Sequence, residues 1–177
     1  MELIKISFII SVKYMGNNVN SKLMGTTVSP INWKDLPAEA RETFIVREIL
    51  THSEDQHRQL LITLSRFKQY ECRNVVKLVD SHTVQSNNLC SIMNYIYAVL
   101  EKPKLTLSSY MSTRVVSSEQ ICRIISDVAK GISFLKKEDN DVDRIKEEMI
   151  FVEEEENGEI TGKIMNPFFK DCGYEGE

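Results

Sequence analysis

The sequence has no apolar run that approaches the roughly 20 consecutive residues of a membrane helix. Its four cysteines stand far apart, and neither they nor the three histidines match the spacing of a zinc site or a disulfide framework. Isolated thiols are typical of a reducing compartment, so we expect a cytoplasmic or nuclear protein with no metal site and no membrane contact. The 22 basic and 26 acidic residues provide no basic surplus for binding nucleic acid.

The N-terminus carries a short apolar run, residues 1–12 (MELIKISFIISV), with no cleavage site of small residues after it. Its isoleucine, phenylalanine and valine content favours a first β-strand over a signal peptide. At 177 residues, with 42% hydrophobic and 27% charged residues, the chain has the composition of one globular domain with its own core.

Two helices are predicted next along the chain. Asp35 can cap a helix over residues 37–50, which opens on a proline that suits the first helical position. Ser53, with Gln56 three residues later, has the pattern of a capping box and predicts a second helix over residues 54–67.

The rest of the chain predicts strands, then helices, then a hairpin. Residues 74–79 and 89–100 are apolar and rich in β-branched side chains, which favours two strands joined by the polar residues 81–88. A short helix over 105–111, a long amphipathic helix over 121–135 capped by Ser117 or Ser118, and an Asn-Gly hairpin over 153–164 follow in that order. Strands and helices in separate blocks indicate an α+β fold.

Several of these segments resemble the protein kinase domain. Residues 72–80 (CRNVVKLVD) are similar to the start of its fourth strand, and residues 97–102 (YAVLEK) to its fifth strand and hinge. The long helix, loop and hairpin follow in the order of the kinase catalytic loop and Asp-Phe-Gly motif. The resemblance implies a single truncated kinase-like domain, with a partial N-lobe sheet in residues 1–101 and the first helices and hairpin of the C-lobe in residues 102–177.

The residues expected at the catalytic positions differ from the kinase pattern. If residues 150–152 match the strand after the catalytic loop, Arg144 replaces the proton-accepting aspartate and Met149 replaces a metal-binding asparagine. Asn166 replaces the metal-binding aspartate of Asp-Phe-Gly. Arginine stays cationic and cannot accept a proton, and a thioether is a poor ligand for Mg²⁺. A shift of one residue would place Asp143 at the first position, an alternative that disturbs the strand alignment.

Four further features of the family are missing. Pro167 and Phe168 replace the packing phenylalanine and the flexible glycine of Asp-Phe-Gly. No G-x-G-x-x-G motif is available to cover the phosphates of ATP, and the second predicted helix has no glutamate in its middle. The resemblance therefore implies a pseudokinase with no catalytic residues and no metal ligands.

A weak nucleotide pocket is an alternative. The resemblance places Lys13, in Ser11-Val12-Lys13, at the strand lysine that anchors the phosphates of ATP, although the same residue can be a solvent-facing strand lysine. It places Leu100 and Glu101 at the hinge, whose backbone as far as Pro103 would hold the base. Lys146 matches a lysine of the catalytic loop that contacts phosphate. We expect no cofactor, with weak ATP binding as the alternative.

The chain ends soon after Asn166, so the resemblance implies that the remaining C-lobe helices are absent. The apolar face of the long helix around Ile124, Val128 and Ile132 would then lack its usual cover, and we expect a protein partner there, with another kinase as a candidate. The function expected from the sequence is a catalytically inactive kinase-like interaction module that regulates its partner. The alternatives are a divergent ATP-binding protein, a weakly active kinase, a gene fragment, and an α+β protein outside the kinase family.

Overall fold

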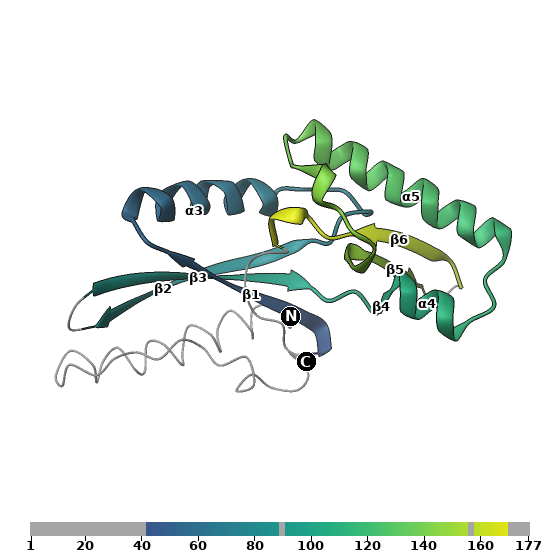
Figure 1. The fold of residues 1–177 in the computed structure, drawn as a ribbon, viewed down its shortest axis with the longest axis horizontal. Helices are drawn as coiled ribbons and strands as arrows, with labels where there is room; N and C mark the ends of the chain where they lie inside the picture. Colours follow the sequence, from purple (N-terminus) through teal and green to yellow (C-terminus); the bar gives the residue numbers. More distant parts are fainter. Residues whose placement is uncertain (1–41, 89–90, 156–157, 170–177) are drawn as a thin grey trace.

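The computed structural model describes residues 42–88, 91–155 and 158–169, with the backbone alone for residues 85–88 and 91–93. Lys13 and the strand predicted within residues 1–12 lie outside these ranges. The described elements form two antiparallel sheets, each accompanied by a long helix (Figure 1). This arrangement confirms the α+β fold.

The first sheet contains β1 (Phe44–Thr51), β2 (Leu78–Asn88) and β3 (Ser91–Glu101), with β3 between the other two. Helix α3 (Glu54–Lys68) lies along one face of this sheet (Figure 1), and its Leu64 and Phe67 belong to the buried core shared with β2 and β3. The helix begins where the sequence predicts, because the Ser53 side chain accepts a hydrogen bond from the Gln56 N–H.

The helix predicted over residues 37–50 was wrong for residues 44–50, which lie in β1. This strand pairs along its whole length with β3, where Ile45 lies opposite Leu100 and Ile49 opposite Ile96. The pairing turns both isoleucines toward the core under α3. Burial of β-branched residues in a paired strand therefore outweighs the helix-start signal at Asp35.

The strand predicted at residues 74–79 begins later, at Leu78, and continues through the polar residues 81–88 that were expected to be a connection. β2 is an edge strand of its sheet, where polar side chains can keep contact with water. The residues before β2 bond to the second sheet instead: the Val76 N–H donates to the Ile164 carbonyl at 2.8 Å, and Val75 forms a parallel bridge with Ile164.

The second sheet contains β4 (Leu105–Thr106), β5 (Ile150–Glu154) and β6 (Ile160–Ile164), with β5 in the middle. Helices α4 (Leu107–Thr113) and α5 (Ser118–Lys137) and the 3-10 turns η2 (Val142–Arg144) and η3 (Glu147–Met149) come before β5, and the 3-10 turn η4 (Pro167–Phe169) follows β6. Helix α5 lies along the second sheet (Figure 1) and begins after a capping box formed by Ser117 and Gln120. The hairpin and the cap at Ser117 are confirmed.

Gly131 allows α5 to approach the backbone of its neighbours closely. A Cβ atom at this position would lie 2.6 Å from the Asn74 carbonyl oxygen and 3.0 Å from Ile164 Cδ1. The same carbonyl accepts the Ile164 N–H at 2.9 Å, so it cannot move away without breaking that hydrogen bond.

We expect Gly131→Ala to lower the free energy of unfolding by about 1–3 kcal/mol, because steric strain outweighs the gain in helix propensity. Urea unfolding measures the change. The exposed Ser133→Ala on the same helix is the control, with an expected change within about 0.5 kcal/mol. Unchanged or higher stability of Gly131→Ala would show that α5 lies farther from these residues.

The apolar face of α5 that was expected to lie uncovered is turned toward the second sheet. Ile124 is only 3% exposed and packs with residues of α4, β5 and β6, while Val128 and Ile132 are partly buried against the neighbouring cores. The expectation was wrong for Ile124, because α4 and the β5–β6 hairpin provide the cover that was assigned to absent helices. A protein partner stays a prediction.

Within the described ranges, no helix combines the length and the apolar character needed to cross a membrane. Cys72 and Cys122 carry free thiols. The cytoplasmic or nuclear location stays a prediction.

Candidate functional site

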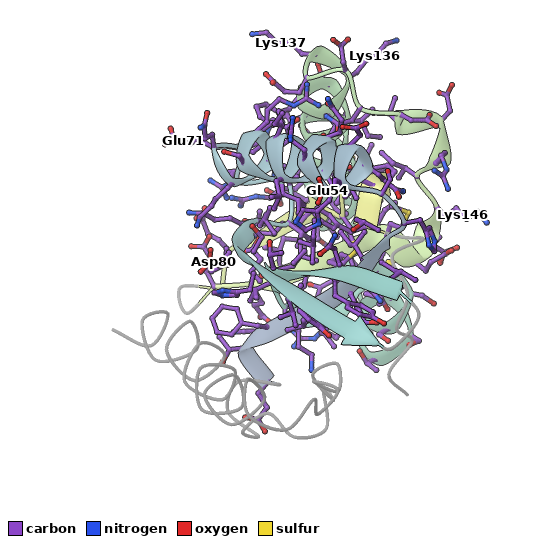
Figure 2. The ribbon with its side chains drawn as sticks, turned by 90° about the vertical axis from the view of Figure 1, so that its left-hand side faces the viewer. Glu54, Glu71, Asp80, Lys136, Lys137 and Lys146 are labelled. Atoms are coloured by element: carbon purple, nitrogen blue, oxygen red, sulfur yellow. The ribbon has the colours of Figure 1, made fainter. Side chains whose placement is uncertain are left out.

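The segment between α5 and β5 holds three of the residues expected near the catalytic loop. Arg144 ends η2 and is exposed, as is the neighbouring Asp143. Lys146 precedes η3 and points outward at the rim of the molecule (Figure 2). Met149, by contrast, is buried in the core that α3 shares with the first sheet. The two cations therefore lie at the surface, and the thioether fills apolar space.

Asn166 is 2% exposed, and the amide group of its side chain is bonded at both ends. Its Nδ2 donates to Asn140 Oδ1 at 2.9 Å, and its Oδ1 accepts the Phe168 N–H at 3.0 Å. The Oδ1 atom therefore already uses one of its two acceptor positions within the protein. The side chain holds the turn into η4 in place.

Asn140, the partner of Asn166, connects this turn to two other parts of the fold. Its Nδ2 lies 3.0 Å from the Tyr70 hydroxyl and 3.1 Å from the carbonyl oxygens of Leu135 and Glu138. Asn166 is therefore linked through Asn140 to the end of α5 and to the segment after α3. Buried polar groups that are bonded in this way favour one local conformation.

Phe168 and Phe169 pack against α3 directly after Asn166. The Phe67 ring centroid lies 5.1 Å from that of Phe168 and 5.8 Å from that of Phe169, and both pairs are edge-to-face. Phe169 is 1% exposed and belongs to the same core as Leu100. Pro167 stands where the kinase pattern has its packing phenylalanine, and the rings of Phe168 and Phe169, one and two positions later in the chain, pack against α3.

The hinge predicted at Glu101 offers no backbone donor to a base. The Glu101 N–H donates to the Lys77 carbonyl at 3.0 Å, and the Lys102 N–H donates to the Thr43 carbonyl at 3.0 Å. Pro103, which is buried, has no N–H. Leu100 is fully buried in the core rather than facing an open pocket. The N–H groups of Glu101 and Lys102 are therefore both bonded within the protein, and nucleotide binding at this segment stays a prediction.

Lys163 on β6 is a mostly buried cation held by two carboxylates. Its Nζ lies 2.9 Å from Glu101 Oε1 and 2.9 Å from Glu153 Oε2, and its side chain is 12% exposed. Burial by itself disfavours the ammonium, but the hydrogen bonds to Glu153 and Glu101 outweigh that effect and raise the pKa of Lys163.

A raised lysine pKa makes the stability depend on pH at the alkaline end. The contribution of Lys163 is complete below the ordinary lysine pKa of about 10.4 and is lost as the pH rises through the raised pKa of the folded state. We expect Lys163→Met to be less stable than the parent chain at neutral pH and the difference to shrink above about pH 10.5. Urea unfolding over a pH series measures this, and a difference that is constant with pH would contradict it.

Arg47 is a cation in the first sheet to which the sequence argument assigned no role. It lies on β1 opposite Ala98 and between Ile45 and Ile49, which both face the core under α3. The acidic residues of α3 are confined to its first turn, where Glu54 is exposed. Figure 2 shows Glu54 on this outer turn. The acidic residues of α3 therefore lie at the exposed start of the helix.

The order of the elements agrees with a family comparison. A model of the protein tyrosine and serine/threonine kinase family matches residues 21–155. The chain belongs to this family. No individual curated protein matches the sequence.

The residues that match the kinase family include the first sheet and strands β4 and β5 of the second. They also include Leu100, Glu101, Arg144, Lys146 and Met149. Lys13 lies before the matched residues, and Asn166 lies after them. The roles expected for Lys13, Lys146 and the hinge in holding a nucleotide stay predictions. Among the described residues, no three histidine, cysteine or acidic side chains gather where they could hold a metal ion.

In the kinase resemblance, the strand before helix C carries the phosphate-anchoring lysine. The strand that directly precedes α3 is β1, so the order of the elements makes Arg47, in Ile45-Val46-Arg47, a second candidate for this position beside Lys13, and both assignments stay predictions. The capping box at Ser53 could have shown this, because a strand before that helix must end close to Thr51. The sequence argument missed this strand because it predicted a helix over residues 37–50.

Proposed function

We propose that the chain is a pseudokinase, a kinase-like module that transfers no phosphate and regulates a protein partner, with another kinase as the leading candidate. The proposal rests on the hydrogen bonds that the Asn166 side chain makes within the protein. Its amide is bonded to Asn140 and to the Phe168 N–H, and it is almost fully buried. The residue expected to hold a catalytic metal is therefore part of the packed interior.

The chemistry of the other positions supports the same proposal. Phosphoryl transfer depends on bound metal ions and on a residue that orients the attacking hydroxyl. Arg144 cannot accept a proton, and Met149 is a soft thioether buried among apolar side chains. Other residues could compensate for the loss of one of these groups. The three losses at Arg144, Met149 and Asn166 together leave neither a proton-accepting base nor hard ligands for a metal ion.

The proposal includes no cofactor. The N–H groups of Glu101 and Lys102 are bonded within the protein, and Pro103 has none, which argues against recognition of an adenine base by the hinge. A kinase-like domain that neither transfers phosphate nor binds a nucleotide still has a surface for binding other proteins. We assign this binding role to the chain.

Phosphoryl transfer from radiolabelled ATP tests the proposal. The purified full chain is incubated with Mg²⁺ or Mn²⁺ and a general protein substrate, beside Arg47→Met as the matched control and an active kinase as the positive control. We expect no label above that of Arg47→Met. Transfer that increases with time, persists through further purification and disappears in Arg47→Met would overturn the proposal.

A further inference from the structure

Helix α5 carries a row of exposed side chains outside the face that covers the second sheet. Ile124, Gly131 and Leu135 are buried on the inner face, whereas Ile125 is 62% exposed. The row follows alternating spacings of four and three residues, which is the spacing of the contact seam between two paired helices. We call this row the outer stripe; its members are Ser118, Cys122, Ile125, Ala129, Ile132 and Lys136, all exposed except Ile132, which is partly buried.

The outer stripe is complementary to itself when a second copy of the helix lies antiparallel to it. With both helices centred on residue 127, its members face those of the second copy in three kinds of pair: Ile125 with Ala129, Cys122 with Ile132, and Ser118 with Lys136. Each pair sets a larger side chain against a smaller one, so successive layers fill similar volumes. A parallel second copy would place every residue opposite itself, which alternates crowded layers with gaps and sets Lys136 against Lys136.

The charges at the two ends of α5 also match an antiparallel second copy. The first turn carries the exposed acid Glu119, and the last turn carries the exposed Lys136 and Lys137. Figure 2 shows both lysines reaching outward at the end of the helix. In the antiparallel pair, Glu119 of each copy lies beside Lys136 of the other, and the helix dipoles are opposed. A surface with opposite charges at its two ends suits a second copy better than a uniformly acidic or basic partner.

We propose that the chain forms a symmetric dimer in which the outer stripes of two α5 helices pack antiparallel. Such an interface uses the same surface of both copies, so it closes on itself and adds no third copy. The contact is only one helix wide, and we therefore expect association in the micromolar range or weaker. The dimer concerns the chain alone and holds whether or not the chain transfers phosphate or regulates another protein.

Analytical ultracentrifugation of the full chain tests the dimer, with a reducing agent present because Cys122 is exposed. Over about 1–300 μM we expect one equilibrium between monomer and dimer. Ile125→Lys is expected to raise the dissociation constant about tenfold or more, because it places two charges in the centre of the contact. The matched control is Ile62→Lys on α3, where the isoleucine is 59% exposed, and we expect a change within about twofold. A monomer at every concentration, or equal effects of the two variants, would overturn the proposal.

Reversal of the end charges tests the antiparallel arrangement and uses exposed residues alone, so it stays decisive if Ile125→Lys fails to fold. Glu119→Lys and Lys136→Glu are each expected to weaken the dimer about threefold or more, because each sets like charges beside each other. The double variant that carries both changes restores the opposite charges, and we expect its dissociation constant to return to within about twofold of the parent value. Failure of the double variant to recover would contradict the antiparallel dimer.

Discussion

Truncation of Phe169 to alanine is expected to lower the free energy of unfolding by about 3–5 kcal/mol. The ring is 1% exposed and lies in the core formed by α3, the first sheet, Met149 and Met165. It also makes edge-to-face contacts with Phe67 at 5.8 Å and with Phe168 at 5.2 Å between centroids. Alanine would remove these contacts and leave a cavity that fixed elements on several sides cannot close.

Urea unfolding measures the loss, and two variants show its origin. Phe169→Leu keeps the site apolar and nearly filled, so we expect a loss below about 1.5 kcal/mol. Val115→Ala removes methyl groups from a fully exposed residue and should change stability by less than about 0.5 kcal/mol. A loss below about 1 kcal/mol for Phe169→Ala would mean that η4 does not pack into this core.

Asn166→Asp, the substitution that would restore a metal-binding aspartate, is expected to destabilise the fold by about 2–4 kcal/mol. The aspartate would lose the hydrogen bond from Nδ2 to Asn140 and would bring a carboxylate oxygen to 2.9 Å from Asn140 Oδ1 in a buried place. Rotation of the Asn140 amide would relieve this contact, but it would turn Nδ2 away from Tyr70 and the Leu135 carbonyl.

Urea unfolding with and without excess MgCl₂ tests this prediction. The account expects the loss to be the same in both conditions, since no metal site is created. The control is Gln59→Glu, which makes the same change from amide to carboxylate on the exposed surface of α3 and should alter stability by less than about 0.5 kcal/mol. Recovery of stability by Mg²⁺ in Asn166→Asp alone would contradict the account.

The parts of the fold predicted correctly are those with strong local signals. The capping boxes at Ser53 and Ser117 fix the starts of α3 and α5, and the Asn-Gly turn between β5 and β6 predicts their hairpin. Local hydrogen bonds determine these features, so a short stretch of sequence contains the information.

The parts predicted wrongly depend on contacts between distant residues. β1 is a strand because β3 lies beside it, and β2 continues through polar residues because it is an edge strand. The face of α5 around Ile124 is covered by α4 and the hairpin, a fact of tertiary packing that helical periodicity cannot show.

The candidate site also combines features that local sequence predicts with features that depend on contacts between distant residues. The assignment of Arg144, Met149 and Asn166 to the catalytic positions could be made from their order along the chain, because the hairpin sets the register, and it stays a prediction. The hydrogen bond between the side chains of Asn166 and Asn140 could not be predicted from the sequence, since it requires the segment after α5 to lie against the turn after β6. Nor could the bonding of the Lys102 N–H be predicted, because its partner, Thr43, is close to it only through the pairing of β1 with β3.

The central claim is that the protein's own residues occupy the positions at which a kinase would hold a nucleotide and its metal. Thermal unfolding of the full chain with and without excess ATP and Mg²⁺ tests this claim most directly, because a ligand that binds only the folded state raises the unfolding temperature. The account predicts a cooperative transition at the same temperature in both conditions. A rise that saturates with ATP and disappears in Arg47→Met would contradict it.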